Sequence, residues 1–275
     1  MVRMLTILAL LLSAGPLAAA ETAWQDVAPG VRVRLIASNV LTPDGKTHAA
    51  LEIDMPPSVK TYWRIPGETG IPTEVDWSGS RGIGSGRVVW PFPTRDDAEG
   101  YVDYVYYGPT VLPMELAVDE AQAMLSASVL MGICSDICMP VTVGFELPLD
   151  FAAADRGQGL RIRQALAASP VGWDGAEPAI AAVSLAPDAR ALQVRIADPE
   201  VDASSLIAAV DDGEALFGPP QKSPEPDLVV LPFLGKGPIK GLEGKPVHLT
   251  FMTHRGPFEQ SLTISLADAP FGGNK

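Results

Sequence analysis

Turns rich in proline and glycine divide almost the whole chain into short segments, and this division constrains the fold more than any other feature. The chain of 275 residues contains 26 Pro and 26 Gly. Its proline content is about twice the usual ~5%. Proline interrupts helices and central strands because it has no N–H donor and a fixed φ. We therefore expect many short strands and turns, and the pattern excludes a helical bundle.

The segments between these turns have the alternating or β-branched patterns of strands. In the first half they cover residues 31–36, 49–55, 86–90, 101–107, 124–133 and 141–149. In the second half they cover residues 181–185, 191–196, 227–231, 246–252 and 260–266. Only residues 160–168 have apolar side chains at helical spacing. Closely spaced strands joined by turns favour antiparallel sandwiches, so we predict an all-β chain with two sandwiches, the second smaller.

The first twenty residues have the pattern of a cleaved export signal. A short basic start precedes an apolar run over residues 4–12, and Ala18-Ala19-Ala20 supplies a small-residue cleavage site. The run is too short to span about 30 Å of hydrocarbon. Residues 1–20 are therefore predicted to be a signal peptide, and the mature protein to be soluble and exported, without stable membrane insertion.

The composition also suggests where one domain ends and the next begins. Residues 150–159 are mostly small and polar, and the predicted helix follows them. We place a first β domain at residues 21–154, a linker with a short helix at 155–170, and a second β-rich domain at 171–275. The sequence does not indicate what the second domain does.

Charge and the scarcity of metal ligands exclude further classes of function. The net charge is −13, with 20 basic and 33 acidic residues. Neutralising phosphates requires clustered Lys and Arg, which the chain lacks, so nucleic acid is not an expected partner. His48, His248 and His254 have no metal-ligand spacing with another His or Cys. We therefore expect neither a metal site among the histidines nor a cofactor.

The only two cysteines, Cys134 and Cys138, lie between strand-like apolar segments. The three residues between them have the right length for a hairpin loop. Partners across such a hairpin have Cα atoms about 4.5–5.5 Å apart, within the range that a disulfide accepts. The two cysteines are thus predicted to face each other at the base of a hairpin.

Three interpretations of this pair stay open on spacing alone. Exported proteins most often use a cysteine pair as a structural disulfide. However, closing a loop of about five residues gains only about 2 kcal/mol, against about 4 for fifty residues. A close pair beside a turn can instead cycle between dithiol and disulfide. The third interpretation is a Cu(I) site, because the thioethers of Met131 and Met139 add soft ligands to the two thiolates.

Five motifs occur in order along the first half: TYWRIPGETGIP at 61–72, DWSGS at 76–80, VWPFP at 89–93, GYVD at 100–103 and CSDICMP at 134–140. Together they resemble the N-terminal periplasmic domain of DsbD-type thiol:disulfide interchange proteins. The resemblance covers about residues 24 to 151. The C-x₃-C spacing of the cysteines is similar to that of the ScsB-like branch.

The resemblance implies an immunoglobulin-like sandwich and a periplasmic thiol–disulfide oxidoreductase. Cys134 and Cys138 would be its catalytic pair, with Cys138 forming the intermolecular disulfide and Cys134 resolving it. Full-length members continue into a membrane domain and a thioredoxin-like domain, which this chain does not include. We therefore expect the donor to be a separate membrane-embedded thiol carrier or thioredoxin-like protein, and the acceptors to be exported thiol proteins. The alternatives are a periplasmic Cu(I)-handling protein and a non-enzymatic binding module with a structural disulfide.

In the family, a loop shields the cysteine pair, and its counterpart here is residues 91–100. Phe92 or Tyr101 would be the covering aromatic, although ordinary core packing also accounts for both rings.

Two further sequence features concern the surroundings of the pair. The run Tyr62-Trp63-Arg64 is interpreted as a buried aromatic strand rather than a partner-facing surface. Asp136 lies between the cysteines, and no Lys or Arg is adjacent to them in sequence. A nearby carboxylate disfavours a thiolate, so the sequence predicts a relay that needs an activated partner.

Overall fold

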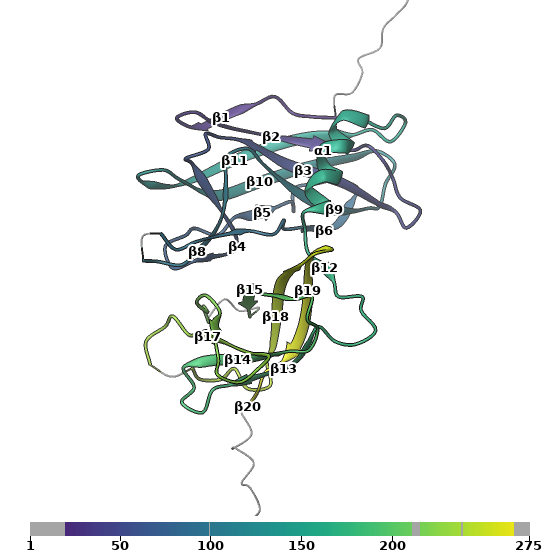
Figure 1. Cartoon of the computed structure of the whole chain (residues 1–275). Helices are drawn as coiled ribbons and strands as arrows, with labels where there is room; N and C mark the ends of the chain where they lie inside the picture. The colour runs from purple at the N-terminus through teal and green to yellow at the C-terminus, as the bar shows by residue number, and fades with distance from the viewer. Residues whose placement is uncertain (1–19, 99, 211–214, 238, 267–275) are drawn as a thin grey trace, which may run out of the picture.

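Antiparallel strands make up most of the regular structure, as the turn pattern predicts. The computed structural model describes residues 20–98, 100–210, 215–237 and 239–266. The predicted export signal lies outside these residues except for Ala20. The strands group into four sheets, two before residue 168 and two after it (Figure 1). We call described residues 20–168 the first unit and the later ones the second unit.

The first unit contains two sheets that share one apolar core. One sheet has the order β1 (Gln25–Ala28), β2 (Val31–Ala37), β3 (Lys46–Asp54), β9 (Thr110–Val118) and β6 (Ile83–Val88). The other has the order β11 (Cys138–Leu149), β10 (Ala123–Cys134), β4 (Lys60–Gly67), β8 (Asp103–Tyr107) and β7 (Thr94–Asp96), and β5 (Glu74–Asp76) also pairs with β10. Trp63 and Tyr104 are the bulkiest buried side chains of this core.

Helix α1 (Arg156–Ala167) packs on the first unit. Asp155 caps it by accepting a hydrogen bond from the backbone N–H of Gln158 at 2.9 Å, which explains why it begins before the predicted residue 160. Ile162 is buried against Ile36 and Ala50 of the β1-to-β6 sheet. In the described part of the chain, no helix has both the length and the apolar character needed to cross a membrane.

The second unit contains two smaller sheets around its own core. One has the order β12 (Val171–Gly172), β19 (Gly256–Thr263), β18 (Pro246–Thr253) and β15 (Asp202–Ala209). The other has the order β16 (Gln221–Lys222), β17 (Leu228–Pro232), β14 (Ala191–Ile196), β13 (Ile180–Leu185) and β20 (Ser265–Leu266). The core includes Phe217, Leu249 and Phe251.

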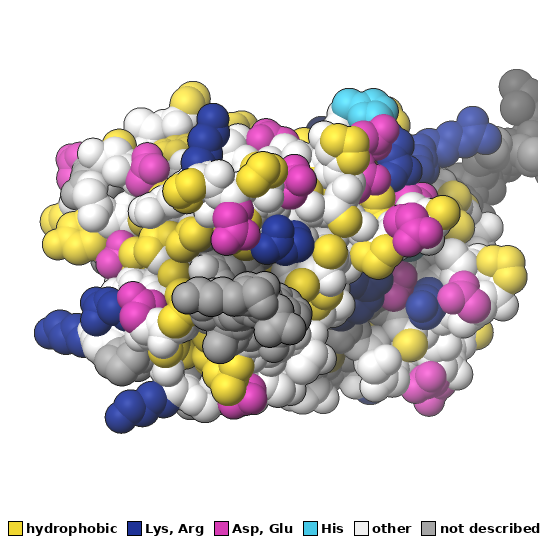
Figure 2. Space-filling view, turned by 60° about the horizontal axis from the view of Figure 1, so that its bottom comes forward, with side chains coloured by type: hydrophobic (Ala, Val, Ile, Leu, Met, Phe, Trp, Pro, Cys, Tyr) yellow, Lys and Arg dark blue, Asp and Glu magenta, His cyan; other side chains and the backbone are white. Residues whose placement is uncertain are grey.

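The two units are in direct contact. Ile207 of β15 is 1% exposed and belongs to the apolar core of the first unit rather than to that of its own unit. On the face seen in Figure 2, acidic, basic and apolar side chains are interspersed.

The sheet orders and the buried clusters confirm a mainly antiparallel β protein with two apolar cores. The immunoglobulin-like topology and the domain boundaries stay predictions.

Candidate functional site

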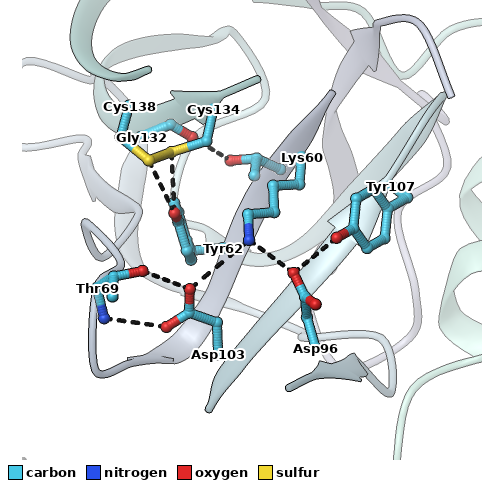
Figure 3. The surroundings of a disulfide bond; sticks show 10 residues. Lys60, Tyr62, Thr69, Asp96, Asp103, Tyr107, Gly132, Cys134 and Cys138 are labelled. Atoms are coloured by element: carbon cyan, nitrogen blue, oxygen red, sulfur yellow. Dashed lines mark hydrogen bonds and ion pairs between the residues drawn. A yellow bond between two sulfur atoms is a disulfide. The ribbon is translucent and has the colours of Figure 1, made fainter. Parts of the chain in front are cut away.

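Strands β10 and β11 form a long hairpin that ends at the two cysteines. The register pairs Cys134 with Cys138 and continues without a bulge to Ala123 and Leu149. The Sγ atoms are bonded, and the two Cα atoms lie 4.1 Å apart (Figure 3). The structure thus confirms the predicted hairpin and the pairing of its cysteines.

The two cysteines differ in exposure. Cys134 is 0% exposed and clusters with Tyr62 and Val105, whereas Cys138 is an exposed residue. The cause lies in the sheet order, because β10 is an inner strand and β11 is an edge strand. An approaching thiolate therefore reaches Cys138 more readily than Cys134.

Tyr62 of β4 contacts both sulfurs from the interior. Its hydroxyl oxygen lies 2.9 Å from Cys134 Sγ and 3.2 Å from Cys138 Sγ (Figure 3). A disulfide sulfur carries no proton, so the hydroxyl is the donor in both contacts. Burial, and then the charge of Asp103, raises the pKa of Tyr62. The hydroxyl consequently keeps its proton at neutral pH and is available to a sulfur that becomes negatively charged.

Lys60 brings a positive charge to the same face. It is the cross-strand partner of Cys134 in the pairing of β4 with β10, so the two side chains point to one side of the sheet. Its Nζ lies 2.6 Å from Asp96 Oδ2 and 3.7 Å from Asp103 Oδ2. Burial disfavours the ammonium, but the hydrogen bond and charge of Asp96 outweigh it, and the pKa of Lys60 is raised. Lys60 was not identified from the sequence, because only residues adjacent to the cysteines were considered there and Lys60 comes from a distant strand.

Two carboxylates complete this network. Asp103 is 3% exposed and accepts hydrogen bonds from the Thr69 backbone N–H at 3.0 Å and from the Thr69 hydroxyl at 2.5 Å. Asp96 accepts a hydrogen bond from the Tyr107 hydroxyl at 2.6 Å as well as the one from Lys60. The hydrogen bond from Lys60, followed by that from Tyr107, lowers the pKa of Asp96. Asp96 is therefore ionised at neutral pH and fixes the position of the ammonium.

The two methionines lie on the other side of the hairpin. Met131 pairs with Val141 and Met139 pairs with Ile133, so both are out of phase with the cysteines in a two-residue repeat. Met131 is 0% exposed and belongs to the core of the first unit. This geometry argues against a Cu(I) site formed by the cysteines and these thioethers. Among the described residues, no group of three or more His, Cys, Asp or Glu side chains could hold a metal ion.

The aromatics from the predicted shielding loop have different environments. Phe92 packs against the core of the first unit, and its backbone N–H donates to Ala168 O at 2.8 Å. Tyr101 is 55% exposed. Their shielding roles stay predictions, and the ring whose hydroxyl contacts the sulfurs is that of Tyr62. Burial of Tyr62 and Trp63 confirms that their strand is packed inside.

A small cavity of about 270 Å³ opens beside the hairpin tip. Ile137 at the tip is 73% exposed, and Met139 is 39% exposed. The cavity is lined by Ala28, Pro29, Val31, Val59, Ile133, Ser135, Asp136, Ile137 and Met139. A larger cavity of about 920 Å³ is lined by residues of both units, including Arg87, Trp173 and Glu259, and by neither cysteine.

Comparisons with known proteins identify relatives of the part of the chain that contains the cysteine pair. Residues 32–149 match the family model described as "Thiol:disulfide interchange protein DsbD, N-terminal". The fold is similar to the crystal structure of the N-terminal periplasmic domain of ScsB from Proteus mirabilis, with 23% identity and a TM-score of 0.68 over 90% of this chain and 100% of that one. No curated protein matches the chain. Residues 32–149, which include both cysteines, therefore match DsbD N-terminal thiol:disulfide interchange domains in sequence.

Proposed function

We propose that this protein is a periplasmic thiol–disulfide oxidoreductase that passes reducing equivalents from a donor thiol to exported proteins. The observation that carries the proposal is the Cys134–Cys138 disulfide at a hairpin end, with one exposed cysteine and one buried beside the Tyr62 hydroxyl. The family match over the same residues supports it. The location rests on the predicted export signal and on the similar ScsB domain, which is periplasmic.

Reduction begins at the exposed sulfur. A donor thiolate attacks Cys138 Sγ, the bond between the two cysteines breaks, and Cys134 leaves as a thiolate. The Tyr62 hydroxyl donates to this thiolate. Lys60, the cross-strand partner of Cys134, places a positive charge on the same face of the sheet. The second donor thiol, as its thiolate, then attacks the donor sulfur bonded to Cys138. The donor leaves as a disulfide, and this protein holds two electrons as a dithiol.

Transfer to an acceptor reverses these roles. The Cys138 thiolate attacks a disulfide of an exported protein, and one acceptor sulfur leaves and takes up a proton. The Cys134 thiolate then attacks Cys138 Sγ in the mixed disulfide, which restores the Cys134–Cys138 bond. The acceptor leaves as a dithiol, so two electrons and two protons have moved in total. By analogy with the family, the donor is a membrane-embedded thiol carrier or a thioredoxin-like protein.

Trapping of mixed disulfides tests this assignment. Cys134→Ser leaves the exposed Cys138 without its resolving thiol, so this variant should accumulate mixed disulfides with exported proteins. Cys138→Ser leaves only the buried Cys134 and should capture much less. Both variants should be expressed in the exporting cell and analysed on non-reducing gels.

The Cys134→Ser/Cys138→Ser double variant is the control. It should fold, because closing a loop of about five residues contributes only about 2 kcal/mol. Failure of both single variants to capture any exported protein would contradict the proposal. A reduction potential of the pair well below about −300 mV would do so as well, because it is typical of a structural disulfide.

A further inference from the structure

The sheet that carries the cysteines ends at the short strand β7, on the edge opposite β11. β7 is its edge strand and pairs with β8 so that Arg95 lies opposite Tyr104 and Asp96 lies opposite Asp103. Because side chains alternate along a strand, these two pairs project to opposite faces. The Asp96 and Asp103 carboxylates lie next to the Lys60 ammonium (Figure 3). The Arg95 and Tyr104 side chains point to the second unit.

The second unit binds these two side chains through backbone carbonyls. Arg95 donates from Nη1 to Ser204 O at 3.1 Å and from Nη2 to Leu206 O at 3.2 Å. Tyr104 is 1% exposed, and its hydroxyl donates to Phe217 O at 3.4 Å.

A third contact involves β4, which carries Lys60 and Tyr62. Arg64 on this strand forms an ion pair with Glu259 of β19, and its Nη2 lies 3.4 Å from Thr250 Oγ1. Each of the three strands that carry Lys60, Asp96 and Asp103 is therefore attached to the second unit.

This attachment matters most for β7. A strand of three residues at a sheet edge has few ladder hydrogen bonds of its own. The planar Arg95 guanidinium engages two carbonyls at once, which restricts it more than a single contact would. Those carbonyls belong to a well-anchored segment, since Leu206 is 0% exposed and Ile207 packs into the first core. The backbone of β7, and with it the Asp96 carboxylate that holds Lys60, is thus fixed from outside the first unit.

We propose that the second unit acts as a positioning element for the redox site. Through Arg95 and Tyr104 it fixes Asp96 and Asp103, and these carboxylates hold the Lys60 ammonium on the face of the sheet that carries Tyr62. Arg95 is accordingly a positioning residue that acts through Asp96. This inference rests on the proposed thiol exchange and gives the second unit a role in it. The charged or titratable groups around the pair are Lys60 and Tyr62 of β4, Asp96 of β7, Asp103 of β8 and Asp136 of the hairpin tip.

Arg95→Met tests the proposal, because it keeps an apolar stem of similar length and removes the donors. The probe is dithiothreitol, whose thiolate attacks Cys138 and which closes to its own cyclic disulfide. We expect the rate constant for reduction of the Cys134–Cys138 bond to fall about three- to tenfold. This is the size of effect that a residue outside a site can have through the contacts that connect it to that site. In the reduced protein, the midpoint pH for alkylation by iodoacetamide should rise, because the Lys60 charge is no longer held on the face of the sheet that carries the cysteine pair. Amides of β7 and β8 should also exchange hydrogen faster.

Arg195→Met is the matched control, since it makes the same change in an exposed ion pair with Glu225 inside the second unit. It should leave the rate and the alkylation midpoint at the wild-type values. If Arg95→Met does not fold, Tyr104→Phe removes only one hydroxyl and should shift both readouts in the same direction by less.

A lower melting temperature of the folded Arg95→Met protein, with unchanged rate and alkylation midpoint, would show a purely structural contact and overturn the proposal. Failure of the proposed function has a different signature. In that case the wild-type disulfide itself would resist dithiothreitol, and its single-cysteine variants would capture no partner.

Discussion

The Tyr62 hydroxyl lies within hydrogen-bonding distance of both sulfurs and is held there by a fully buried ring. A hydrogen bond to a charged group is worth about 1.5–3 kcal/mol, so Tyr62→Phe should slow reduction of the disulfide by roughly tenfold or more. The same change should raise the pKa of the Cys134 thiol in the reduced protein, because the thiolate loses its donor. Stopped-flow reduction with dithiothreitol and pH-dependent alkylation measure the two effects.

Tyr106→Phe is the control for this prediction. Tyr106 is also buried, on the neighbouring strand β8, and its hydroxyl donates to Pro91 O at 2.7 Å rather than to a sulfur. Removing it should affect stability but not the reactivity of the cysteines. Equal rates in Tyr62→Phe and the wild type would show that the hydroxyl does not assist the leaving sulfur.

Asp96 makes stability depend on pH at the acid end. Its folded-state pKa is held below the usual 3.8 by Lys60 and then Tyr107. As the pH falls past about 3.8, Asp96 binds a proton in the unfolded chain before it does so in the folded one. The stabilisation is therefore present above about pH 3.8 and is lost as the pH falls through the folded-state pKa. The contribution of Lys60 to stability depends on pH in the opposite direction. Because its pKa is raised in the folded protein, that contribution is present at neutral pH and is lost only at alkaline pH.

Denaturant unfolding of Asp96→Asn and the wild type between about pH 6 and about pH 3 checks this linkage. The wild type should be the more stable protein at neutral pH, and the difference should shrink toward the acid end. Asp188→Asn, at an exposed turn, serves as the control for the substitution itself. A difference between Asp96→Asn and the wild type that is the same at all pH values would contradict the assignment.

At the scale of elements, the β10–β11 hairpin positions the sulfurs by leaving room for the Tyr62 ring. Gly132 lies two residues before Cys134, and a Cβ added there would be 2.9 Å from Ile71 Cβ and 3.0 Å from Tyr62 Cδ2. Gly132→Ala should therefore displace the ring and its hydroxyl. We expect slower reduction by dithiothreitol in a protein that still folds.

Gly144→Ala is the matched control on the same hairpin, because an added Cβ meets nothing within 4 Å there. It should keep the wild-type rate. A Gly132→Ala protein that is reduced as fast as Gly144→Ala would mean that the position of the ring is not critical.

The elements also show how far sequence reasoning reaches. The hairpin and its cysteine pair were predictable, because alternation and loop length are local signals. Strand β9 was not predicted, since Pro113 in its middle argues against a central strand. Lys60, Asp96 and Asp103 were not recognised as one group because they come from three strands, and no spacing in the sequence reports on their pairing.

At the scale of the whole molecule, contacts between distant segments were beyond sequence reasoning. The ion pair of Arg64 with Glu259 joins residues 195 positions apart. The predicted linker helix proved to be packed on the first unit, with Ile162 buried. What the second unit contributes could therefore be inferred only from the assembled structure.

Ile207 should couple the unfolding of the two units, because it lies in the core of the first unit although it belongs to the second. Ile207→Ala leaves a cavity that costs about 2–5 kcal/mol. We expect calorimetry to show one transition for the wild type and two for this variant. Ile162→Ala, equally buried under α1, should lower the melting temperature without separating the transitions. A single transition in Ile207→Ala would contradict the coupling.

The unbroken register of the β10–β11 hairpin has a kinetic consequence. It keeps Cys134 opposite Cys138 whether or not their sulfurs are bonded, so the resolving thiol has a high effective molarity toward any disulfide formed at Cys138. Covalent complexes with partners should then be short-lived. The flux of electrons would be limited by how often partners collide productively with Cys138, and each collision would end in complete transfer or in return to the starting state.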